Sequence, residues 1–425
     1  MTMLILFGSL ILLVALSVPI GIAIGIASMI TILLSGTIDL SMLIQKLFTS
    51  LDSFPLLAIP FFMFAGLLMG RGGISQRILQ FANQLVGWMA GGLAMVTVVA
   101  CTFFAALSGS GPATVAAIGS FMIPEMKKRN YDGAFASALT AAAGCIGVLI
   151  PPSIPFILYG VISGASIGEL FKAGILPGFL IAILLMIVSY ITIKKDGNKI
   201  IQDNTDYSFK ALIKSLYDAK WALLAPIIIL GGIYGGIFTP TEASVIAIVY
   251  AFIIGTFVHK DLNWKAIKEG LIETINLTGA TMYMIGTSIA FAYLLSTEQI
   301  PLKIAHFITS ITSNEIVILL LMNLFLLIIG AFVDTIPALA MLTPILLPIA
   351  TSIGIDPVHF GVIMVMNLAI GFVTPPFGIN VFIASSVGKV PIERLFKAMV
   401  PFILFLVLGL LLISFIPSIS LVFTK

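Results

Sequence analysis

Two matched pairs of segments combine small polar residues with glycine and proline, a composition suited to ion chemistry. The first pair is 108–113 (SGSGPA) with 147–152 (GVLIPP), and the second is 334–338 (DTIPA) with 371–376 (GFVTPP). The prolines of the two pairs are separated by 39 and 38 residues. Backbone at membrane depth can leave helical geometry only where it is buried in protein or lines a wet cavity. The repeated spacing therefore favours two functional breaks over two incidental kinks.

Helix ends within a membrane expose carbonyl oxygens at one end and N–H groups at the other. Hard oxygen ligands with few carboxylates suit a monovalent cation, so the sequence predicts two sodium sites. The predicted ligands of sodium site 1 are Ser108, Gly147, Ile150 and Pro152, and those of sodium site 2 are Gly330, Asp334, Gly371, Thr374 and Phe377. Exposed N–H groups could receive a carboxylate substrate. The predicted side-chain donors to it are Ser110, Thr335 and Asn380.

Acidic residues within the predicted spans are few. Two of them, Asp334 and Glu242, and the neutral Asn367 are interpreted one by one. Asp334, beside the second break, is either an ion-linked carboxylate or a cap for the next helix. Glu242 follows Pro240 and is interpreted as a first-turn acid of a helix. Asn367 lies one turn before Gly371 and either braces the broken backbone or contacts a ligand.

Composition identifies an integral membrane protein. Sixty per cent of the 425 residues are hydrophobic and 9% are charged, too few charges to cover a soluble protein of this length. The sequence has no phosphate-binding G-x-x-x-x-G-K-[ST] motif and no nucleophile–base constellation. It therefore predicts no enzyme activity, no cofactor other than coupling sodium ions, and no nucleic-acid partner.

The elements that would position these residues form two halves. The predicted organisation is a first repeat at 1–194, a cytoplasmic linker at 195–221 and a second repeat at 222–425. We expect a re-entrant hairpin at about 90–125 and a broken helix at about 132–165 in the first repeat. The matching elements of the second repeat are expected at about 314–351 and 357–387. Each half would then have five crossings, so the fold class is an all-α polytopic membrane protein with two inverted-topology repeats.

The distribution of basic residues tests this topology independently, because lysine and arginine gather on the cytoplasmic side. With both termini placed outside, 17 lysines and arginines fall inside and four fall outside. The outside residues are Lys46, Lys172, Lys303 and Lys425. The bias supports inverted repeats in the lipid bilayer.

Two classes of function fit a membrane protein with these breaks. A secondary transporter would place polar residues at midplane breaks that line a binding site. A channel would show a continuous polar lining or a ring of like charges, and a passive scaffold needs neither. Polar residues cluster at two breaks here, which favours the transporter and leaves a channel or passive scaffold subunit as the alternative.

Four segments resemble one family over essentially the whole chain. They are 108–114 (SGSGPAT), 148–153 (VLIPPS), 231–243 (GGIYGGIFTPTEA) and 374–378 (TPPFG). These residues look like the large membrane subunit of tripartite ATP-independent periplasmic (TRAP) transporters, and the run 231–243 is the most specific signature.

The resemblance implies an elevator-type importer in the bacterial inner membrane that couples organic-acid uptake to sodium. Its implied partners are a small four-helix membrane subunit and a periplasmic substrate-binding protein. Sialic acid and a C4-dicarboxylate both remain open as the small carboxylate substrate.

Overall fold

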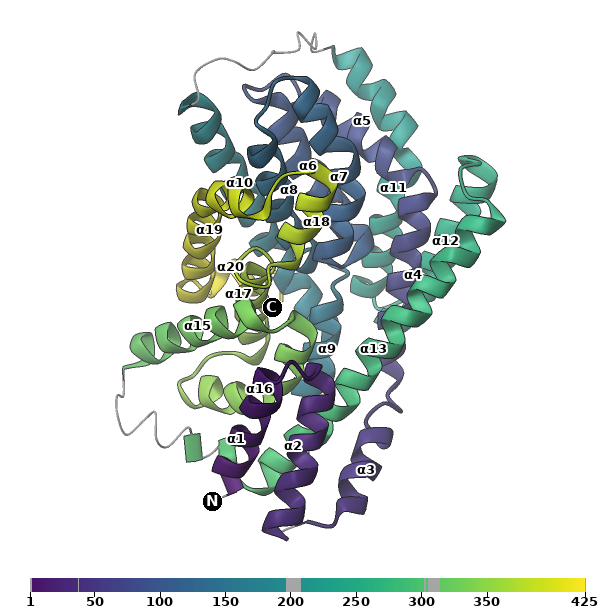
Figure 1. Cartoon of the computed structure of the whole chain (residues 1–425). Helices are drawn as coiled ribbons and strands as arrows, with labels where there is room; N and C mark the ends of the chain where they lie inside the picture. Colours follow the sequence, from purple (N-terminus) through teal and green to yellow (C-terminus); the bar gives the residue numbers. More distant parts are fainter. Residues whose placement is uncertain (1, 37, 196–207, 302, 305–313, 425) are drawn as a thin grey trace.

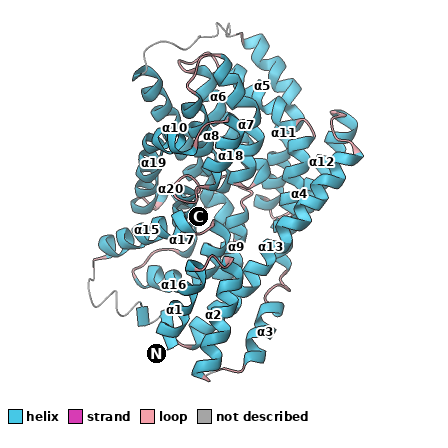
Figure 2. Cartoon of the chain, viewed as in Figure 1, coloured by secondary structure: helices cyan, strands magenta, loops and turns pink. Residues whose placement is uncertain are grey.

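The computed structural model describes residues 2–424 apart from 37, 196–207, 302 and 305–313, and all regular secondary structure within these residues is helical (Figure 2). The expected all-α class is confirmed. The elements of the N-terminal part are α1 Thr2–Ala15, α2 Ile20–Ser35, α3 Leu40–Thr49, η1 Phe54–Leu57, α4 Ala58–Arg71, α5 Ile74–Val86, α6 Gly92–Ser108, α7 Gly111–Lys128, α8 Gly133–Gly144, η2 Cys145–Val148, α9 Ile154–Ser163 and α10 Ile167–Lys195. The later elements are α11 Phe209–Tyr234, α12 Pro240–Ile253, η3 Ile254–Val258, α13 Trp264–Thr297, α15 Glu315–Phe332, α16 Thr335–Ser352, α17 Pro357–Gly371, α18 Ile379–Gly388, α19 Ile392–Phe415 and α20 Ser418–Leu421.

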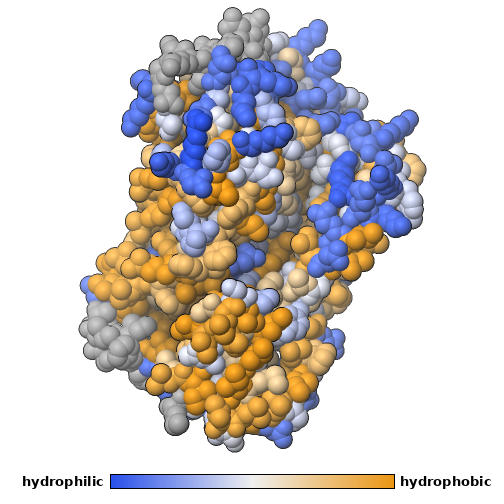
Figure 3. All heavy atoms as spheres, viewed as in Figure 1, coloured by the Kyte–Doolittle hydropathy of each residue, from blue (hydrophilic) through white to orange (hydrophobic). Residues whose placement is uncertain are grey.

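Helix length and hydropathy agree with a polytopic membrane protein. Among the described residues, 8 helices are long and apolar enough to cross a membrane, and seven shorter apolar helices accompany them. Figure 3 shows hydrophobic residues over most of the visible surface, while hydrophilic residues gather at the end that carries the α7–α8 and α12–α13 connections. This uneven distribution of polar residues agrees with the sequence-based charge bias.

The helices fall into two groups that are defined by their contacts (Figure 1). The first helix group contains α1–α4 and α11–α13, and the second helix group contains α6–α10 and α15–α20. The groups meet mainly where α4 packs on α6 and α13 packs on α16, while α5 contacts both groups through α11 and α6. Both pairs of predicted breaks lie in the second helix group.

The centre of the second helix group consists of the two helices that precede the Pro-Pro motifs. Every residue of α8 from Ala134 to Gly144 is buried, and so is every residue of α17 from His359 to Gly371. Helix α8 is rich in alanine, glycine and serine, and such small side chains let neighbouring helices approach closely. The two helices that lead into the Pro-Pro motifs are thus buried within the protein.

The observed boundaries differ from the sequence-based expectations at two places. Helix α3 was not expected, and it begins at an Asp39 side chain that accepts a hydrogen bond from the Ser41 N–H. Helix α11 already begins at Phe209, within the segment 195–221 assigned to a linker. The rest of that linker lies mostly outside the described residues. The inverted orientation of the two repeats stays a prediction.

Candidate ion and substrate site

The tip between α6 and α7 is shaped by three consecutive residues. Helix α6 ends at Ser108, Gly109 follows in the left-handed conformation (φ 60°), and Ser110 caps α7 by accepting a bond from the Ala113 N–H at 3.4 Å. Glycine adopts the left-handed conformation at little cost, and serine is a favoured N-cap. A Cβ on Gly109 would lie 2.5 Å from the carbonyl oxygen of Pro152, so the tip packs directly on the first Pro-Pro motif.

Three oxygen atoms gather at this tip, and we call them the oxygen cluster. The Oγ of Ser108 lies 3.0 Å from Oγ1 of Thr114, which in turn donates to the carbonyl oxygen of Ser110 at 2.8 Å. Gly147 closes one side, because a Cβ there would lie 2.7 Å from both the Ser110 carbonyl oxygen and the Thr114 Oγ1. Hydroxyl and carbonyl oxygens at such spacing are suitable ligands for a monovalent cation.

The other two predicted ligands of sodium site 1 lie around this cluster. Pro152 is buried, and its carbonyl oxygen faces Gly109 at the tip. Ile150 is 6% exposed and packs against Gly178 of α10. The structure thus brings Ser108 and Gly147 together with Ser110, and places the side chain of Ile150 in a helix contact.

The second break brings Gly330 and Gly371 into direct backbone contact. A Cβ on Gly371 would lie 2.1 Å from the carbonyl oxygen of Gly330, so only glycine fits at this approach. Asp334 caps α16, with its carboxylate accepting a bond from the Thr335 N–H at 2.7 Å. Asp334 therefore has the capping role that was its structural interpretation. Its side chain is exposed in this chain. Its role in ion binding stays a prediction.

The chain after α17 follows a different course from the chain after α8. Thr374 turns back and donates its hydroxyl to the carbonyl of Ile370 at 2.8 Å. Pro375, Pro376 and Phe377 are exposed, whereas Pro151 and Pro152 are buried. The second break therefore reaches the surface of the described chain, and the first is enclosed.

The two breaks nevertheless have a corresponding backbone hydrogen bond, one in each half. The N–H of Ile154 donates to the carbonyl of Gly109 at 3.2 Å, and the N–H of Phe377 donates to the carbonyl of Ala331 at 3.3 Å. In each half, a donor just after the Pro-Pro motif binds a carbonyl near the end of the preceding hairpin helix. The peptide bond within each Pro-Pro pair is cis.

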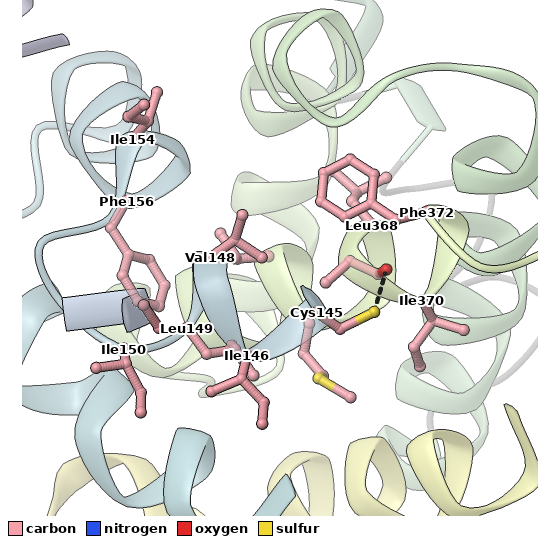
Figure 4. Packing of buried hydrophobic residues seen from close by; sticks show 14 of the residues in the cluster. Cys145, Ile146, Val148, Leu149, Ile150, Ile154, Phe156, Leu368, Ile370 and Phe372 are labelled. Carbon is pink, nitrogen blue, oxygen red and sulfur yellow. Dashed lines mark hydrogen bonds between the residues drawn. The ribbon is translucent and has the colours of Figure 1, made fainter. Parts of the chain in front are cut away.

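Contacts between the halves hold the breaks against one another. The Asn380 amide donates to the carbonyl of Ala141 at 3.1 Å, and a Cβ on Gly111 would touch the ring of Phe372 at 3.1 Å. Figure 4 shows the thiol of Cys145 hydrogen-bonded to the backbone of α17 between Leu368 and Ile370, at the carbonyl of Ala369 (3.1 Å). Elements of both halves therefore build one continuous core around the two breaks.

The predicted substrate donors all have partners within the chain. Ser110 caps α7, and the hydroxyl of buried Thr335 donates to the carbonyl of Leu368 at 3.4 Å. Asn380 is completely buried and uses its amide nitrogen on Ala141, while its Oδ1 has no partner. Gly144 lies between two of them, because a Cβ there would be 2.8 Å from Nδ2 of Asn380 and 3.2 Å from the carbonyl oxygen of Gly111, the residue after Ser110. Contact of the three residues with a substrate stays a prediction.

Two further polar features escaped the sequence analysis. Thr114 completes the oxygen cluster, and its position four residues after Ser110 is the signal that could have identified it. Asn323 of α15 accepts a bond from the Asn367 amide at 2.8 Å and donates to Ser414 at 3.0 Å. Asn367 therefore braces α17 against α15.

The interpretation of Glu242 is confirmed, because it forms a capping box with Thr239 at the start of α12.

Comparison of the sequence with known families gives a match over almost the full chain. Residues 7–419 match the family described as "Tripartite ATP-independent periplasmic transporter, DctM component". A relative from Oleidesulfovibrio alaskensis, named as an isethionate TRAP transporter permease protein DctMQ, is 47% identical over 99% of this chain. This chain spans 66% of the length of that relative.

Two further relatives match along most of their own length. A C4-dicarboxylate TRAP transporter large permease protein from Pseudomonas aeruginosa is 42% identical over 94% of this chain and 93% of its own. A sialic acid TRAP transporter large permease protein from Vibrio cholerae is 39% identical over 95% of this chain and 94% of its own. All three names describe transport proteins.

Solved structures of distant sequence share the fold. The YdaH transporter of Alcanivorax borkumensis superposes with a TM-score of 0.62 at 17% identity, covering 88% of each chain. The antimetabolite efflux pump MtrF of Neisseria gonorrhoeae gives 0.56 at 13% identity, covering 87% of this chain and 83% of its own. With a family match over residues 7–419 and relatives of up to 47% identity, this multi-pass membrane protein belongs to the large-permease (DctM) family of TRAP transporters.

Proposed function

We propose that this chain is the large membrane subunit of a sodium-coupled importer of a small organic anion. The observation that carries the proposal is the oxygen cluster of Ser108, Ser110 and Thr114, which lies against Gly147 and the first Pro-Pro motif. Uncharged oxygens beside a broken helix suit sodium better than a divalent ion. The second coupling ion would lie near Gly330, Gly371 and Asp334.

Movement of one helix group against the other would carry the substrate across the membrane. The second helix group contains both breaks and is held together by bonds such as Asn380 to Ala141 and Cys145 to Ala369. It approaches the first helix group closely at Gly66 of α4, where a Cβ would lie 3.1 Å from the Cα of Ser108. Because no side chain of Gly66 stands between the two backbones, this close contact supports a sliding, elevator-type movement.

The membrane setting and partners follow from the family. We place the chain in the bacterial inner membrane with both termini in the periplasm, because this orientation puts most lysines and arginines inside. A small four-helix membrane subunit and a periplasmic substrate-binding protein would complete the transporter. The DctMQ relative is longer than this chain, which agrees with a second subunit being part of that relative.

The substrate class is a small organic acid. Relatives of this chain are named for C4-dicarboxylates, for sialic acid and for isethionate, which are all anions. Carboxylates are the expected class, with a sialic acid or a C4-dicarboxylate as the candidates. The name of the isethionate relative adds a sulfonate to the compounds worth testing.

Uptake into proteoliposomes tests the proposal directly. The vesicles would contain this chain and its small membrane subunit, and labelled succinate, sialic acid or isethionate would be presented on its binding protein. We expect one anion to accumulate above its external concentration when sodium is imposed outside, and to stop accumulating when sodium is equal on both sides.

The same assay separates the alternative functions. A channel or passive pore would bring the anion to equal concentration on both sides, whatever the sodium gradient. If this chain is only a scaffold, vesicles that contain the small membrane subunit without this chain would accumulate the anion as well. Either result from well-folded complex would contradict the proposal.

A further inference from the structure

A cavity lies away from the breaks, at the opposite ends of α15 and α17. Its volume is about 290 Å³, and it is lined by the start of α15, the α16–α17 connection, the start of α17, and the α19–α20 corner. These elements lie side by side near the C-terminus in Figure 1. This volume is slightly below the range of about 300–1,000 Å³ typical of drug-sized ligand sites, so the cavity fits a small molecule.

Two carboxylates and a buried histidine line this cavity. Glu315 and Asp356 supply carboxylates, and Asp356 already uses one oxygen, Oδ1, to cap α17 through the N–H groups of Val358 and His359. The His359 ring is 2% exposed and is hydrogen-bonded to the backbone of Ser414. Its Nδ1 is buried with no partner. A buried polar atom without a partner costs free energy, which a ligand donor at this wall would recover.

The charge of the cavity selects the sign of its ligand. Among the residues that the structure describes, no lysine or arginine lines it. The remaining wall is mainly apolar, with Leu319, Ile355 and Phe415 among its residues. Two negative charges and a neutral acceptor require a cationic donor, and the apolar wall accommodates a short alkyl portion.

We propose that this cavity binds a primary ammonium group on a short alkyl chain. The N–H donors would be shared between the Glu315 and Asp356 carboxylates and the Nδ1 of His359. A membrane lipid with an ethanolamine headgroup and a free alkylamine both present this chemistry. The proposal concerns a site separate from the breaks, and it does not depend on the transport function.

The test compares two cations of equal charge in the purified full-length chain in detergent. Labelled n-butylammonium carries three N–H donors, and labelled n-butyltrimethylammonium carries none. We expect n-butylammonium to bind with a dissociation constant at least about tenfold lower, as is typical for hydrogen bonds to charged groups. Phosphatidylethanolamine and phosphatidylcholine are then added as competitors that differ in the same way.

Three variants locate the binding. Glu315→Gln removes a negative charge and replaces one acceptor oxygen by a donor, and His359→Phe removes an acceptor nitrogen. Each should weaken n-butylammonium binding about tenfold. Glu393→Gln is the matched control, because Glu393 is also an exposed acid in the first turn of a long helix. It should leave binding unchanged. Glu315→Gln keeps the test valid if His359→Phe does not fold.

Each outcome decides the proposal or its source. Displacement by phosphatidylethanolamine and not by phosphatidylcholine supports a lipid headgroup as the natural ligand. Selective n-butylammonium binding that neither lipid displaces supports a free amine. Equal binding of the two cations overturns the proposal, and so does equal binding by Glu315→Gln and Glu393→Gln.

Discussion

Single residues decide what the tip between α6 and α7 can bind. Ser108 and Ser110 were identified from their composition and from the proline that follows. Thr114 was not, because the one signal that it carries, a position four residues after Ser110, is not distinctive for a threonine inside a helix. Its importance comes from a three-dimensional neighbour, Gly147, which the fold brings within contact distance. Backbone ligands are equally hard to recognise in a sequence, since every residue type carries a carbonyl.

Thr114→Val should weaken sodium binding while preserving the fold. Valine has nearly the same shape as threonine but lacks the hydroxyl that lies 3.0 Å from the Ser108 hydroxyl. We expect the sodium concentration for half-maximal uptake to rise about tenfold, the effect of losing one favourable oxygen contact. Thr102→Val is the control, because that buried hydroxyl bonds only within its own helix. Equal effects of the two changes would exclude Thr114 as a ligand.

Asp334→Asn separates the capping role from the charge of this residue. Asparagine caps a helix about as well as aspartate, so α16 should remain folded. We expect sodium-dependent uptake to require several times more sodium, because a negative charge beside the second break attracts the ion. An unchanged sodium response in well-folded protein would leave Asp334 with the capping role alone.

Gly371→Ala should destabilise the protein through a backbone clash. The new Cβ would lie 2.1 Å from the Gly330 carbonyl oxygen, and neither backbone can move without separating α15 from α17. We expect a loss of about 1–3 kcal/mol, measured by thermal unfolding in detergent. Gly279→Ala, in α13, meets nothing within 4 Å and should be neutral or slightly stabilising. Similar melting temperatures for the two variants would contradict the observed close contact.

At the scale of elements, proline and glycine made the breaks predictable. The hairpins expected at about 90–125 and 314–351 fall on the helix pairs α6–α7 and α15–α16, whose tips carry the capping residues Ser110 and Asp334. Their re-entrant course in a membrane stays a prediction. Helix α3 has 10 residues, which is too short for a membrane span of about 20, so a search for spans did not reveal it. Helix α11 begins earlier than expected, at Phe209, because the polar composition of 195–221 indicated a linker and gave no sign of a helix.

Gly66→Val should slow the movement between the two helix groups. Gly66 lies on α4, and the Cα of Ser108 is already 3.1 Å from where its Cβ would be. Valine would act as a wedge at the tip of the first hairpin, so we expect uptake to fall by at least tenfold. Gly8→Val is the control, because nothing lies within 4 Å of the Cβ position at Gly8. Full uptake by Gly66→Val would show that this contact does not limit transport.

At the scale of the whole molecule, the two halves interact within both helix groups, through pairs such as α4 with α12 in the first group and α8 with α18 in the second. The Lys127 ammonium donates to the carbonyl of Gly388 at 3.0 Å, and Arg394 pairs with Asp132 at 2.8 Å. Both contacts join the first half to the second at the polar end of α7 and α8. Exposed ion pairs contribute little stability individually, so the packing of α8 on α18 and α19, and of α4 on α12, must hold the halves together.

Cross-links placed within and between the helix groups should have opposite effects on transport. Gly133→Cys with Val390→Cys lies within the second helix group, where a Cβ on Gly133 is 3.4 Å from the Val390 side chain. Gly70→Cys with Phe104→Cys joins α4 to α6 across the groups, where the corresponding distance is 3.9 Å. The native thiols, Cys101 and Cys145, are buried and would be replaced by alanine in both variants.

A cleavable dithiol-reactive linker lets each variant serve as its own reference. Uptake is measured before linking, after linking, and after the linker has been cleaved by reductant. If the second helix group moves as one body, a link between positions 133 and 390 leaves uptake unchanged, because both ends travel together. A link between positions 70 and 104 ties the moving group to the fixed one, so uptake should stop and should return on cleavage. Undiminished uptake with this second link in place would mean that the anion crosses without displacement of the groups, and would favour a channel.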